Sequence, residues 1–448
     1  MNKSQEQWTS KLGFILAAAG SAIGIGVIWK FPYMVGTNGG GIFFLMFILF
    51  TLIIGAPILI TEFIIGRRTQ KDAVRAYKEL APGTPWTLIG YCGVIASIIL
   101  LSFYSVVGGW ILSYLIRSVT NSLSNLTQQQ YGDLFNTIIS NPYETVIAQL
   151  IFMLITIWVV QGGIQQGIEK ASKYMMPALF ILFLVLLVRS LTLDGAMEGV
   201  KFFLKPDTSV LSEQTVLLAL GQAFFALSIG ISVMVTYASY LNKNEDLTKS
   251  ALSVVGLNIF IALLAGLVIF PAVFALGFDP ASGPGLVFVV LPAVFNEIAF
   301  GSVFMFIFFI LILFATLTSA FSILEIVVAA MVKGDEANRK KSSWVAGILV
   351  FIIGIPSALS FGVLSHITLF NKSIFDIADF LVSNIALPVG ALFISLFVGF
   401  QLKRLHVEEE FLSGSSYGKK IFKVWYFLIR YIAPIAIAIV LLSSIGFI

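Results

Sequence analysis

The chain has 448 residues, of which 58% are hydrophobic and only 11% are charged. Soluble globular domains carry charge on about a quarter of their residues, so this composition excludes an ordinary water-soluble protein. The formal net charge of +4 comes from basic residues in short loops and not from one basic face, so we expect no nucleic-acid partner. The single cysteine, Cys92, excludes an internal disulfide, and its apolar neighbours predict a packing role.

Membrane-spanning segments account for most of the chain. Apolar runs of about twenty residues recur, and each is long enough to cross a hydrocarbon layer roughly 30 Å thick. We therefore predict an all-α polytopic membrane protein in a lipid bilayer, with about eleven transmembrane helices. The predicted spans lie near residues 11–35, 41–66, 87–117, 143–161, 165–189, 215–240, 250–277, 300–332, 343–361, 375–401 and 424–446.

Basic residues between the spans predict the orientation. They cluster after the second, sixth, eighth and tenth spans, for example at Arg67, Lys243, Lys333 and Lys403. Because basic loops face the cytoplasm, we place these loops and the N-terminus inside the cell and the C-terminus outside, in a protein of the cell membrane.

Two predicted spans are interrupted. The first carries glycines at positions 20, 24 and 26, with Lys30 and Pro32 directly after them, and the sixth contains FFALSIGIS. Paired interruptions indicate an inverted-repeat transporter. Alternatively, small residues simply let helices pack closely, and spacing alone does not separate the two interpretations. The predicted organisation is a single transporter domain, 1–448, with inverted repeats at about 11–189 and 215–401 and an extra helix at 424–446.

Several motifs together identify a family. The chain contains GSAIGIG at 20–26, followed by WKFPY and NGGG, then TEFIIGR at 61–67, GIEK at 167–170, FFALSIG at 224–230, TYASYL at 236–241 and ATLTSAFS at 315–322. From Trp8 into the last span, this pattern resembles the neurotransmitter:sodium symporter family, whose bacterial branch includes amino-acid transporters. The resemblance implies a Na⁺-coupled symporter that works by alternating access, with discontinuous first and sixth helices in a five-plus-five inverted-repeat fold.

The resemblance also implies where an amino acid binds. The N–H groups of Ile25 and Gly26 and the hydroxyl of Tyr104 would hold the carboxylate, although without the resemblance Tyr104 is equally a packed aromatic residue. The backbone carbonyls of Ala22, Phe225 and Ala226, with the Ser228 side chain, would hold the amine. The side-chain pocket would be apolar and suit an aliphatic or aromatic substrate; its lining would be Leu100, Tyr104, Phe225, Ile231, Ser319 and Ile323.

Gly24 bears on the substrate class. Monoamine transporters of the family carry an aspartate at this position, and a glycine leaves that charge to the substrate, which favours an α-amino acid. An amine or another non-standard solute stays open as an alternative substrate. A nutrient sensor that does not transport also stays open, because its binding residues would look the same.

In the family, one sodium site joins the first and eighth spans. It uses carbonyls at positions matching Gly20, Ile23 and Ala315 and the hydroxyls of Thr318 and Ser319. A hard cation prefers such oxygen ligands. We therefore predict that these residues bind Na⁺, whereas two helical hydroxyls alone would more often bond to a carbonyl of their own helix.

The other sodium site of the family is incomplete in this chain. Its asparagine and threonine positions are Val27 and Ala226, and only Asn258 keeps an oxygen-bearing side chain. A dehydrated sodium ion would be under-coordinated among these hydrocarbon groups. The positions that neutralise the extra charge are also changed, to Phe47 and Ala262. We therefore expect coupling to one sodium ion and no chloride requirement.

Residues at both ends of the substrate path match the family's gates. Lys30 and Asp379 match the extracellular pair and Phe225 matches the aromatic lid, although each charge alone is equally a surface charge. On the cytoplasmic side, Trp8 and Tyr240 are kept.

Two further positions concern the inner gate and the fifth span. Gln5 and Lys333 stand at or near the positions of the family's arginine–aspartate latch, so we expect an inner gate that closes less firmly. Gly167 and Pro177 have the spacing of a helix-unwinding motif, although a proline can also simply kink a helix.

An intramembrane enzyme is the main rival from another class. ALSIG at 226–230 lacks the first glycine and the strand context of a nucleophile elbow. His366 and His406 fall in predicted loops, so neither a serine–histidine pair nor a zinc site is indicated, and we expect no enzyme activity. We expect a monomer or a loose dimer.

Overall fold

The computed structural model describes residues 6–120, 122–124, 126–281, 283, 285–444 and 447. Within these residues the chain forms helices and two isolated β-bridges, and no strand. Nine helical segments in this part of the chain are long and apolar enough to cross a membrane. They are built from α3 (Gly41–Phe50), η2 (Thr51–Gly55) and α4 (Ala56–Thr69); α6 (Thr87–Val119); α8 (Pro142–Val160); η3 (Ile164–Glu169) and α9 (Lys170–Leu191); α13 (Leu247–Ala275); α15 (Gly301–Val332); η6 (Glu336–Asn338) and α16 (Arg339–Leu359); α17 (Ile374–Phe380), η7 (Leu381–Ala386), α18 (Leu387–Leu396) and η8 (Phe397–Gln401); and α20 (Lys419–Phe427), η9 (Leu428–Ile432) and α21 (Ala433–Ser444).

Two further spans are broken helices, and they are the two that the sequence predicts. The first consists of α1 (Lys11–Ala22) followed by η1 (Gly26–Lys30) and α2 (Phe31–Thr37), and it bends by 50° at the break. The sixth consists of α11 (Glu213–Ala226) and α12 (Val233–Ser239), with non-helical residues between them. Counted as one span, the first pair brings the candidate crossings in the described residues to ten, and the crossing by α11 and α12, the eleventh, stays a prediction.

The sixth span breaks because its backbone leaves the right-handed region. Ser228, Gly230 and Ser232 have φ angles of 53°, 97° and 60°. A side chain is strained in this conformation, and at Gly230 a Cβ would also contact the carbonyl of Leu387. The glycine therefore permits both the turn and the close approach of α18.

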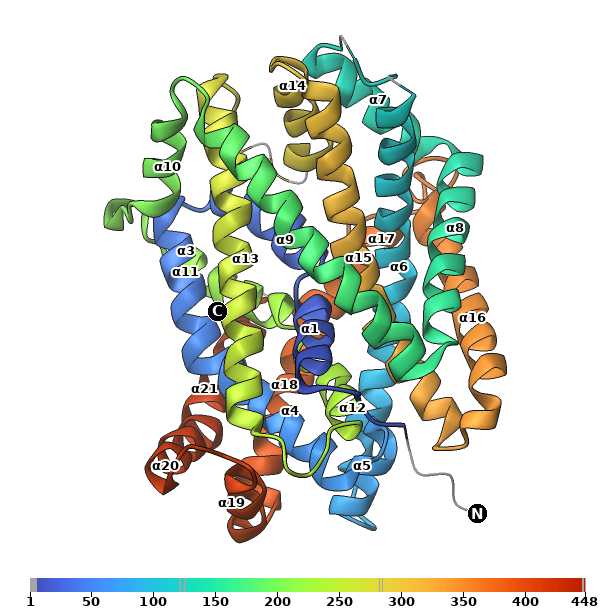
Figure 1. Ribbon diagram of the computed structural model, residues 1–448, viewed down its shortest axis with the longest axis vertical. Helices are drawn as coiled ribbons and strands as arrows, with labels where there is room; N and C mark the ends of the chain where they lie inside the picture. Colours follow the sequence, from blue (N-terminus) through green and yellow to red (C-terminus); the bar gives the residue numbers. More distant parts are fainter. Residues whose placement is uncertain are drawn as a thin grey trace.

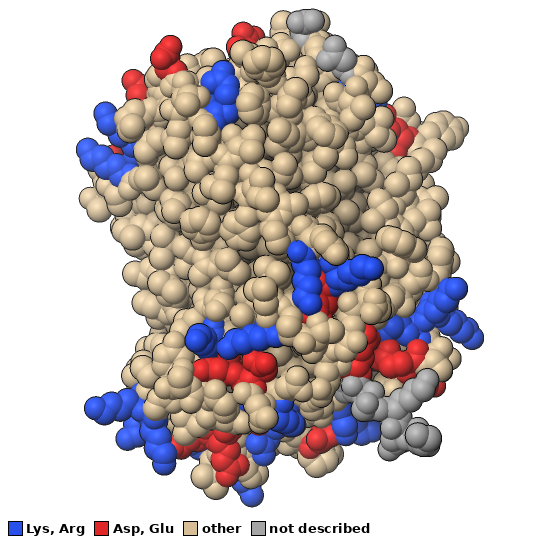
Figure 2. All heavy atoms as spheres, in the orientation of Figure 1, with Lys and Arg blue, Asp and Glu red and all other residues tan. Residues whose placement is uncertain are grey.

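Shorter helices cover the two ends of the bundle (Figure 1). The upper end in this view carries α7 (Gln128–Ser140), α10 (Ala196–Leu204) and α14 (Leu291–Asn296), the last preceded by η5 (Leu286–Val290). The lower end carries α5 (Ala73–Leu80), α19 (Arg404–Leu412) and the N-terminal segment. Charged side chains gather toward the two ends, and a broad uncharged band crosses the face between them (Figure 2). That band is the expected surface of a protein that spans a bilayer.

Burial separates an inner set of spans from a peripheral set. In the most apolar window of α6, 78% of the residues are buried, and in that of α15, 67%, whereas the last span has only 22% buried. The third and eighth spans therefore line the interior around the broken helices. Cys92 on α6 is exposed, which corrects the packing role predicted for it, because it lies on the outer face of that helix.

Candidate functional site

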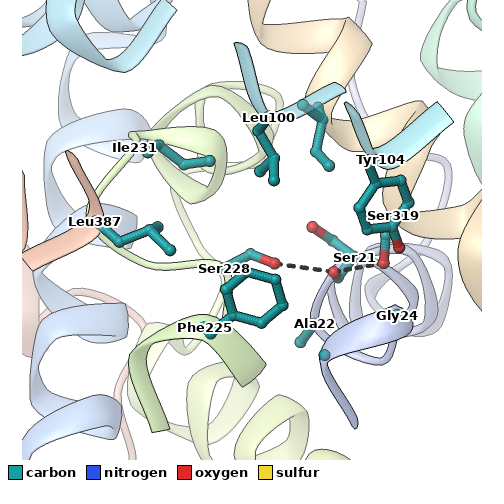
Figure 3. Close-up of a pocket in the computed structure, with 12 residues that line it drawn as sticks. Ser21, Ala22, Gly24, Leu100, Tyr104, Phe225, Ser228, Ile231, Ser319 and Leu387 are labelled. Atoms are coloured by element: carbon teal, nitrogen blue, oxygen red, sulfur yellow. Dashed lines mark hydrogen bonds between the residues drawn. The ribbon is translucent and has the colours of Figure 1, made fainter. Parts of the chain in front are cut away.

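The two broken helices meet beside α6 and α15 (Figure 3). Where α1 ends, the carbonyl of Ser21 accepts hydrogen bonds from the hydroxyls of Ser228, at 3.0 Å, and Ser319, at 2.9 Å. These two serines come from the break of the sixth span and from α15. In a bilayer, a carbonyl freed by a break must find its partner within the protein, and here side chains supply it.

A cavity lies between the two breaks, with about 350 Å³ of unfilled space. Its lining includes nine of the eleven substrate residues predicted from sequence: Ala22, Gly26, Leu100, Tyr104, Phe225, Ser228, Ile231, Ser319 and Ile323. The other two, Ile25 and Ala226, are buried and adjoin the lining residues Gly26 and Phe225 in the sequence. Ser21, Gly24 and Leu387 complete the wall.

The cavity has a polar side and an apolar side (Figure 3). Tyr104, Ser319 and Ser21 lie together on one side, and Leu100, Ile231 and Leu387 lie across from them. No charged side chain lines the cavity in the described part of the chain. A charged ligand must therefore be balanced by backbone groups and helix ends.

The polar side contains the start of a half-helix. The N–H of Ile25 donates to the Tyr104 hydroxyl over 3.2 Å, and the helix resumes at Gly26. A helix N-terminus carries partial positive charge and unpaired N–H groups, so it attracts an anion. This end of the cavity therefore favours a carboxylate.

Two glycines make room for this arrangement. A Cβ on Gly24 would lie 2.5 Å from the Tyr104 hydroxyl, and one on Gly26 would lie 2.6 Å from the Phe225 ring. Real Cβ atoms do not approach other atoms so closely, so a larger residue at position 24 would displace Tyr104. An aspartate at that position is incompatible with this packing.

Four oxygens of the predicted sodium site converge between α1 and α15. The Thr318 hydroxyl lies 3.0 Å from the carbonyl oxygens of both Gly20 and Ala315, and the Ser319 hydroxyl lies 3.0 Å from that of Gly20. Both side chains are almost fully buried. A compact, uncharged set of hydroxyl and carbonyl oxygens is the chemistry that a hard monovalent cation requires, so these residues fit Na⁺. Ile23, the fifth predicted ligand, lies at the break itself, where its N–H donates to Ala19.

At the positions of the incomplete sodium site, the structure has hydrocarbon side chains and one side-chain amide. Val27 and Ala226 are fully buried. The Asn258 amide nitrogen donates to the carbonyl of Ala226 over 2.8 Å and to that of Ala22 over 3.3 Å. A side-chain amide on α13 therefore joins the two broken helices through the carbonyls left open at their breaks.

The charge-neutralising positions are likewise occupied by the protein's own groups. The Gln222 amide nitrogen donates to the carbonyl of Gly26 over 2.6 Å. The Phe47 ring packs on Phe31 with 4.9 Å between centroids, and Ala262 is fully buried. This region contains packed hydrocarbon and a side-chain amide bonded to backbone.

Above the cavity, the predicted outer gate residues lie together. The Lys30 amine is 3.8 Å from an Asp379 carboxylate oxygen and 4.5 Å from the centre of the Phe225 ring. Ser383 links the two charges, since its hydroxyl donates to Asp379 over 2.7 Å. Phe225 and Tyr104 separate the lower cavity from an upper space of about 370 Å³ that Lys30 and Asp379 also line. In this conformation Lys30, Asp379 and Phe225 lie in contact above the cavity, and their role as a gate stays a prediction.

Below the cavity, Trp8 and Tyr240 lie at the lower gate. The Trp8 backbone N–H donates to the Tyr240 carbonyl over 3.1 Å, and its indole N–H donates to the Tyr237 carbonyl over 2.9 Å. The Tyr240 hydroxyl donates to Glu325 over 2.7 Å, and Glu325 pairs with Arg339 at 2.8 Å. A buried ion pair therefore supports this gate.

Of the two residues at or near the positions of the family's latch, the structure describes only Lys333, which takes no part in that pair. Lys333 is exposed, and Gln5 lies outside the described residues. In the fifth span, Gly167 lies in the π-helical turn η3 and Pro177 lies inside α9. Both are wound into helix in this conformation, and their role in unwinding stays a prediction.

Three features of the site were not predicted. Leu387 lines the cavity, but nothing in its local sequence distinguishes it from other leucines. The amide of Asn258 acts as a cross-link, which sequence spacing does not reveal. Glu325 and Arg339 form a buried pair, and here a signal existed, because an acidic residue inside an apolar span is by default paired or functional.

Comparisons with known proteins agree with this architecture. A family model described as the Sodium:neurotransmitter symporter family matches residues 5–137 and 139–447. A relative from Bacillus subtilis named as an uncharacterized sodium-dependent transporter, YhdH, is 56% identical over 440 residues, with 98% of each chain covered. One from Haemophilus influenzae with a similar name is 37% identical, with 99% of each chain covered.

A solved structure is also similar throughout. MhsT, crystallised in complex with L-phenylalanine, matches with a TM-score of 0.91 and 45% identity, covering 98% of this chain and all of its own. Family match, relatives and fold coincide over nearly the whole length. The chain therefore belongs to the neurotransmitter:sodium symporter family, and it is a multi-pass, sodium-dependent membrane symporter with the family's inverted-repeat fold, not an enzyme.

Proposed function

We propose that this protein imports a hydrophobic α-amino acid, coupled to one sodium ion per cycle and without chloride. The observation that carries the substrate class is the cavity, which has a half-helix N-terminus on one side and the aliphatic side chains of Ile231 and Leu387 across from it. An amino acid brings both a carboxylate and an ammonium group, so it needs no charged residue in the wall. The complex of MhsT with L-phenylalanine supports this assignment.

In the proposed binding mode, the carboxylate faces the N–H groups of Ile25 and Gly26 and the Tyr104 hydroxyl. The ammonium group faces backbone carbonyls at the end of α11 and the Ser228 hydroxyl, where the helix dipole is negative. The substrate side chain points to Leu100, Ile231 and Ile323. Gly24 supports an amino acid over an amine, because an aspartate there would collide with Tyr104.

In this proposal the sodium ion binds at Gly20, Ile23, Ala315, Thr318 and Ser319. An ion held by carbonyls of the broken first helix and hydroxyls of α15 would stabilise the closed arrangement of these two elements. The Asn258 amide supports a count of one, because it already satisfies two carbonyls that a further ion would need. An under-coordinated ion among Val27 and Ala226 would gain too little to offset its dehydration.

The transport cycle would alternate between the two gates. Lys30, Asp379 and Phe225 would close the path above the substrate, and Trp8 and Tyr240 would close it below. Loop charges support an orientation with the lower end and the N-terminus in the cytoplasm. The halves at about 11–189 and 215–401 would move relative to each other around the site, in a monomer or a loose dimer.

Transport by purified protein in liposomes tests the proposal. We expect an inward sodium gradient to drive accumulation of labelled L-phenylalanine, with a sodium Hill coefficient near one and no change when gluconate replaces chloride. Exchange of labelled for unlabelled substrate across the membrane would exclude a sensor that only binds. A Hill coefficient near two, or a chloride requirement, would contradict the coupling scheme, and uptake of amines but not amino acids would contradict the substrate class.

A further inference from the structure

A second, larger space lies on the outside of the bundle, between α6 and the tenth span. It is a groove with about 1170 Å³ of unfilled space. Its lining carries no charged, amide or hydroxyl side chain in the described residues; it consists of Pro85, Trp86, Leu88, Ile89, Cys92, Gly93, Ala96, Gly230, Ile231, Ile385, Ala386, Val389, Gly390 and Phe393. A groove with such walls suits hydrocarbon and not water.

The groove opens onto the surface that faces the membrane. Leu88 and Phe393, which line it, are 60% and 44% exposed, and Ile95, beside it on α6, is 56% exposed. All three lie inside apolar membrane-spanning segments. The groove is therefore continuous with the lipid-facing surface of the protein.

The inner wall of the groove is the break of the sixth span. Gly93 on α6 lets that helix approach so closely that a Cβ there would lie 2.6 Å from the Ile231 carbonyl, and Gly390 on α18 packs likewise on the carbonyl of Gly230. The two helices pack against the broken segment from either side, and its buried residues Gly230 and Ile231 form the inner wall of the groove between them.

Two backbone N–H groups of the broken segment have a partner outside the groove lining. Glu62 on α4 accepts hydrogen bonds from the N–H groups of Gly230, at 2.7 Å, and Met234, at 3.2 Å. The carbonyls of Gly230 and Ile231 instead lie against Gly390 and Gly93 in the groove wall. An apolar chain can cover this backbone without leaving those N–H groups unpaired.

Ile231 separates the groove from the cavity, since this residue lines both spaces. In Figure 3 its side chain forms the apolar end of the cavity together with Leu387. At this point one residue stands between the cavity and the groove. Whatever fills the groove therefore supports the wall of the site.

We propose that one acyl chain of a membrane phospholipid lies in this groove and braces Ile231 against the substrate cavity. The hydrocarbon lining and its continuity with the lipid-facing surface favour a chain. Trp86 closes the lower end, with its ring 5.4 Å from that of Phe397, and amphipathic rings of this kind sit at headgroup depth. α5, which packs on α6, carries the exposed Lys78 at the same end, which favours an anionic headgroup.

Native mass spectrometry of purified protein with 1-palmitoyl-2-oleoyl-phosphatidylglycerol tests the binding. Val389→Trp fills the groove, and Ala96→Leu fills it more mildly if the first variant does not fold. Ile95→Trp adds the same ring on the same membrane-facing surface outside the groove. We expect wild type and Ile95→Trp to keep one phospholipid that the groove variants lose. Equal retention by all variants, or equal loss, would overturn the proposal.

The bracing effect rests on the proposed function and has its own readout. Adding the same phospholipid to delipidated wild type should raise the affinity for L-phenylalanine, measured by thermal stabilisation in sodium, about fivefold, the lower end of coupling between two sites. The groove variants should not respond. An unchanged affinity in wild type would overturn the bracing. If L-phenylalanine stabilises none of the proteins, the substrate assignment fails, while the phospholipid count still decides whether the groove binds a chain.

Discussion

Two regions of this molecule match the sodium sites of the family, and they differ in chemistry. One keeps its oxygen-bearing groups, and the other has hydrocarbon at two of those positions. Around Thr318 and Ser319, hydroxyl and carbonyl oxygens converge between α1 and α15. Around Asn258, the neighbouring positions are hydrocarbon, and an amide donates to the carbonyls that remain. Both solutions tie a broken helix to an intact one. The comparison shows that a break in a membrane helix needs partners for its carbonyls, and that hydroxyl groups supply them in one region and an amide N–H in the other.

The largest expected effect comes from removing a sodium ligand. Thr318→Val should raise the sodium concentration for half-maximal substrate-dependent stabilisation roughly 10- to 100-fold, because a bond to a charged group contributes about 1.5–3 kcal/mol. Thr316→Val is the matched control, since this buried threonine on the same helix bonds only to its own helix, at Ile312. If both substitutions change this sodium concentration equally, the Thr318 hydroxyl is not a sodium ligand. The contrast between the two regions would then fail.

Removing the amide cross-link should cost stability and leave sodium dependence intact. Asn258→Leu has a similar volume and leaves the carbonyls of Ala22 and Ala226 without a donor, so we expect unfolding to become easier by about 1–3 kcal/mol. Thermal unfolding without substrate measures this loss, and a sodium titration of the same variant provides the control. A large shift in sodium affinity would mean that Asn258 is itself an ion ligand.

Rebuilding the incomplete site sharpens the comparison. The double variant Val27→Asn with Ala226→Thr restores two oxygen-bearing side chains beside Asn258. We expect the Hill coefficient for sodium in transport to rise above one, because the rebuilt site offers the ion oxygens that hydrocarbon now replaces. Each single variant is its own control and should stay near one. If the double variant also stays near one, the missing oxygens are not what limits the stoichiometry.

The smallest expected effect concerns the outer gate, which sits above both regions. Asp379→Asn removes a pair whose charges are partly exposed, at 3.8 Å, so solvent screens much of the attraction. Such pairs contribute about 0.2–1 kcal/mol, so substrate should dissociate only about two- to fivefold faster. Stopped-flow release of labelled substrate measures this rate. A hundredfold change would show that Asp379 contributes more than gate closure.

The sequence analysis predicted the broken spans and the cavity lining more completely than the contacts between residues of different helices. The broken spans and most of the cavity lining follow from motifs at fixed spacing, and the structure brings those residues together. Leu387 was missed because its place in the wall depends on how α18 packs against the break, which is a tertiary property. Asn258 was identified as a remnant of a site, but the direction of its hydrogen bonds depends on which carbonyls the breaks leave open. Glu325 lies within α15 and Arg339 begins α16, so the two become paired only when these helices pack together.

Glu62 attaches the lower half of the sixth span, α12, to the second span. Its carboxylate binds the N–H groups of Gly230 and Met234 at the start of α12, and Gly66 on the same helix lets α4 press against the α12 backbone. The lower half-helix, α12, is therefore bonded to α4 in the second span. We expect these two elements to move together as one rigid unit. The break itself, with its left-handed residues at 228, 230 and 232, is then the point about which these two elements would turn, and the cavity lies beside it.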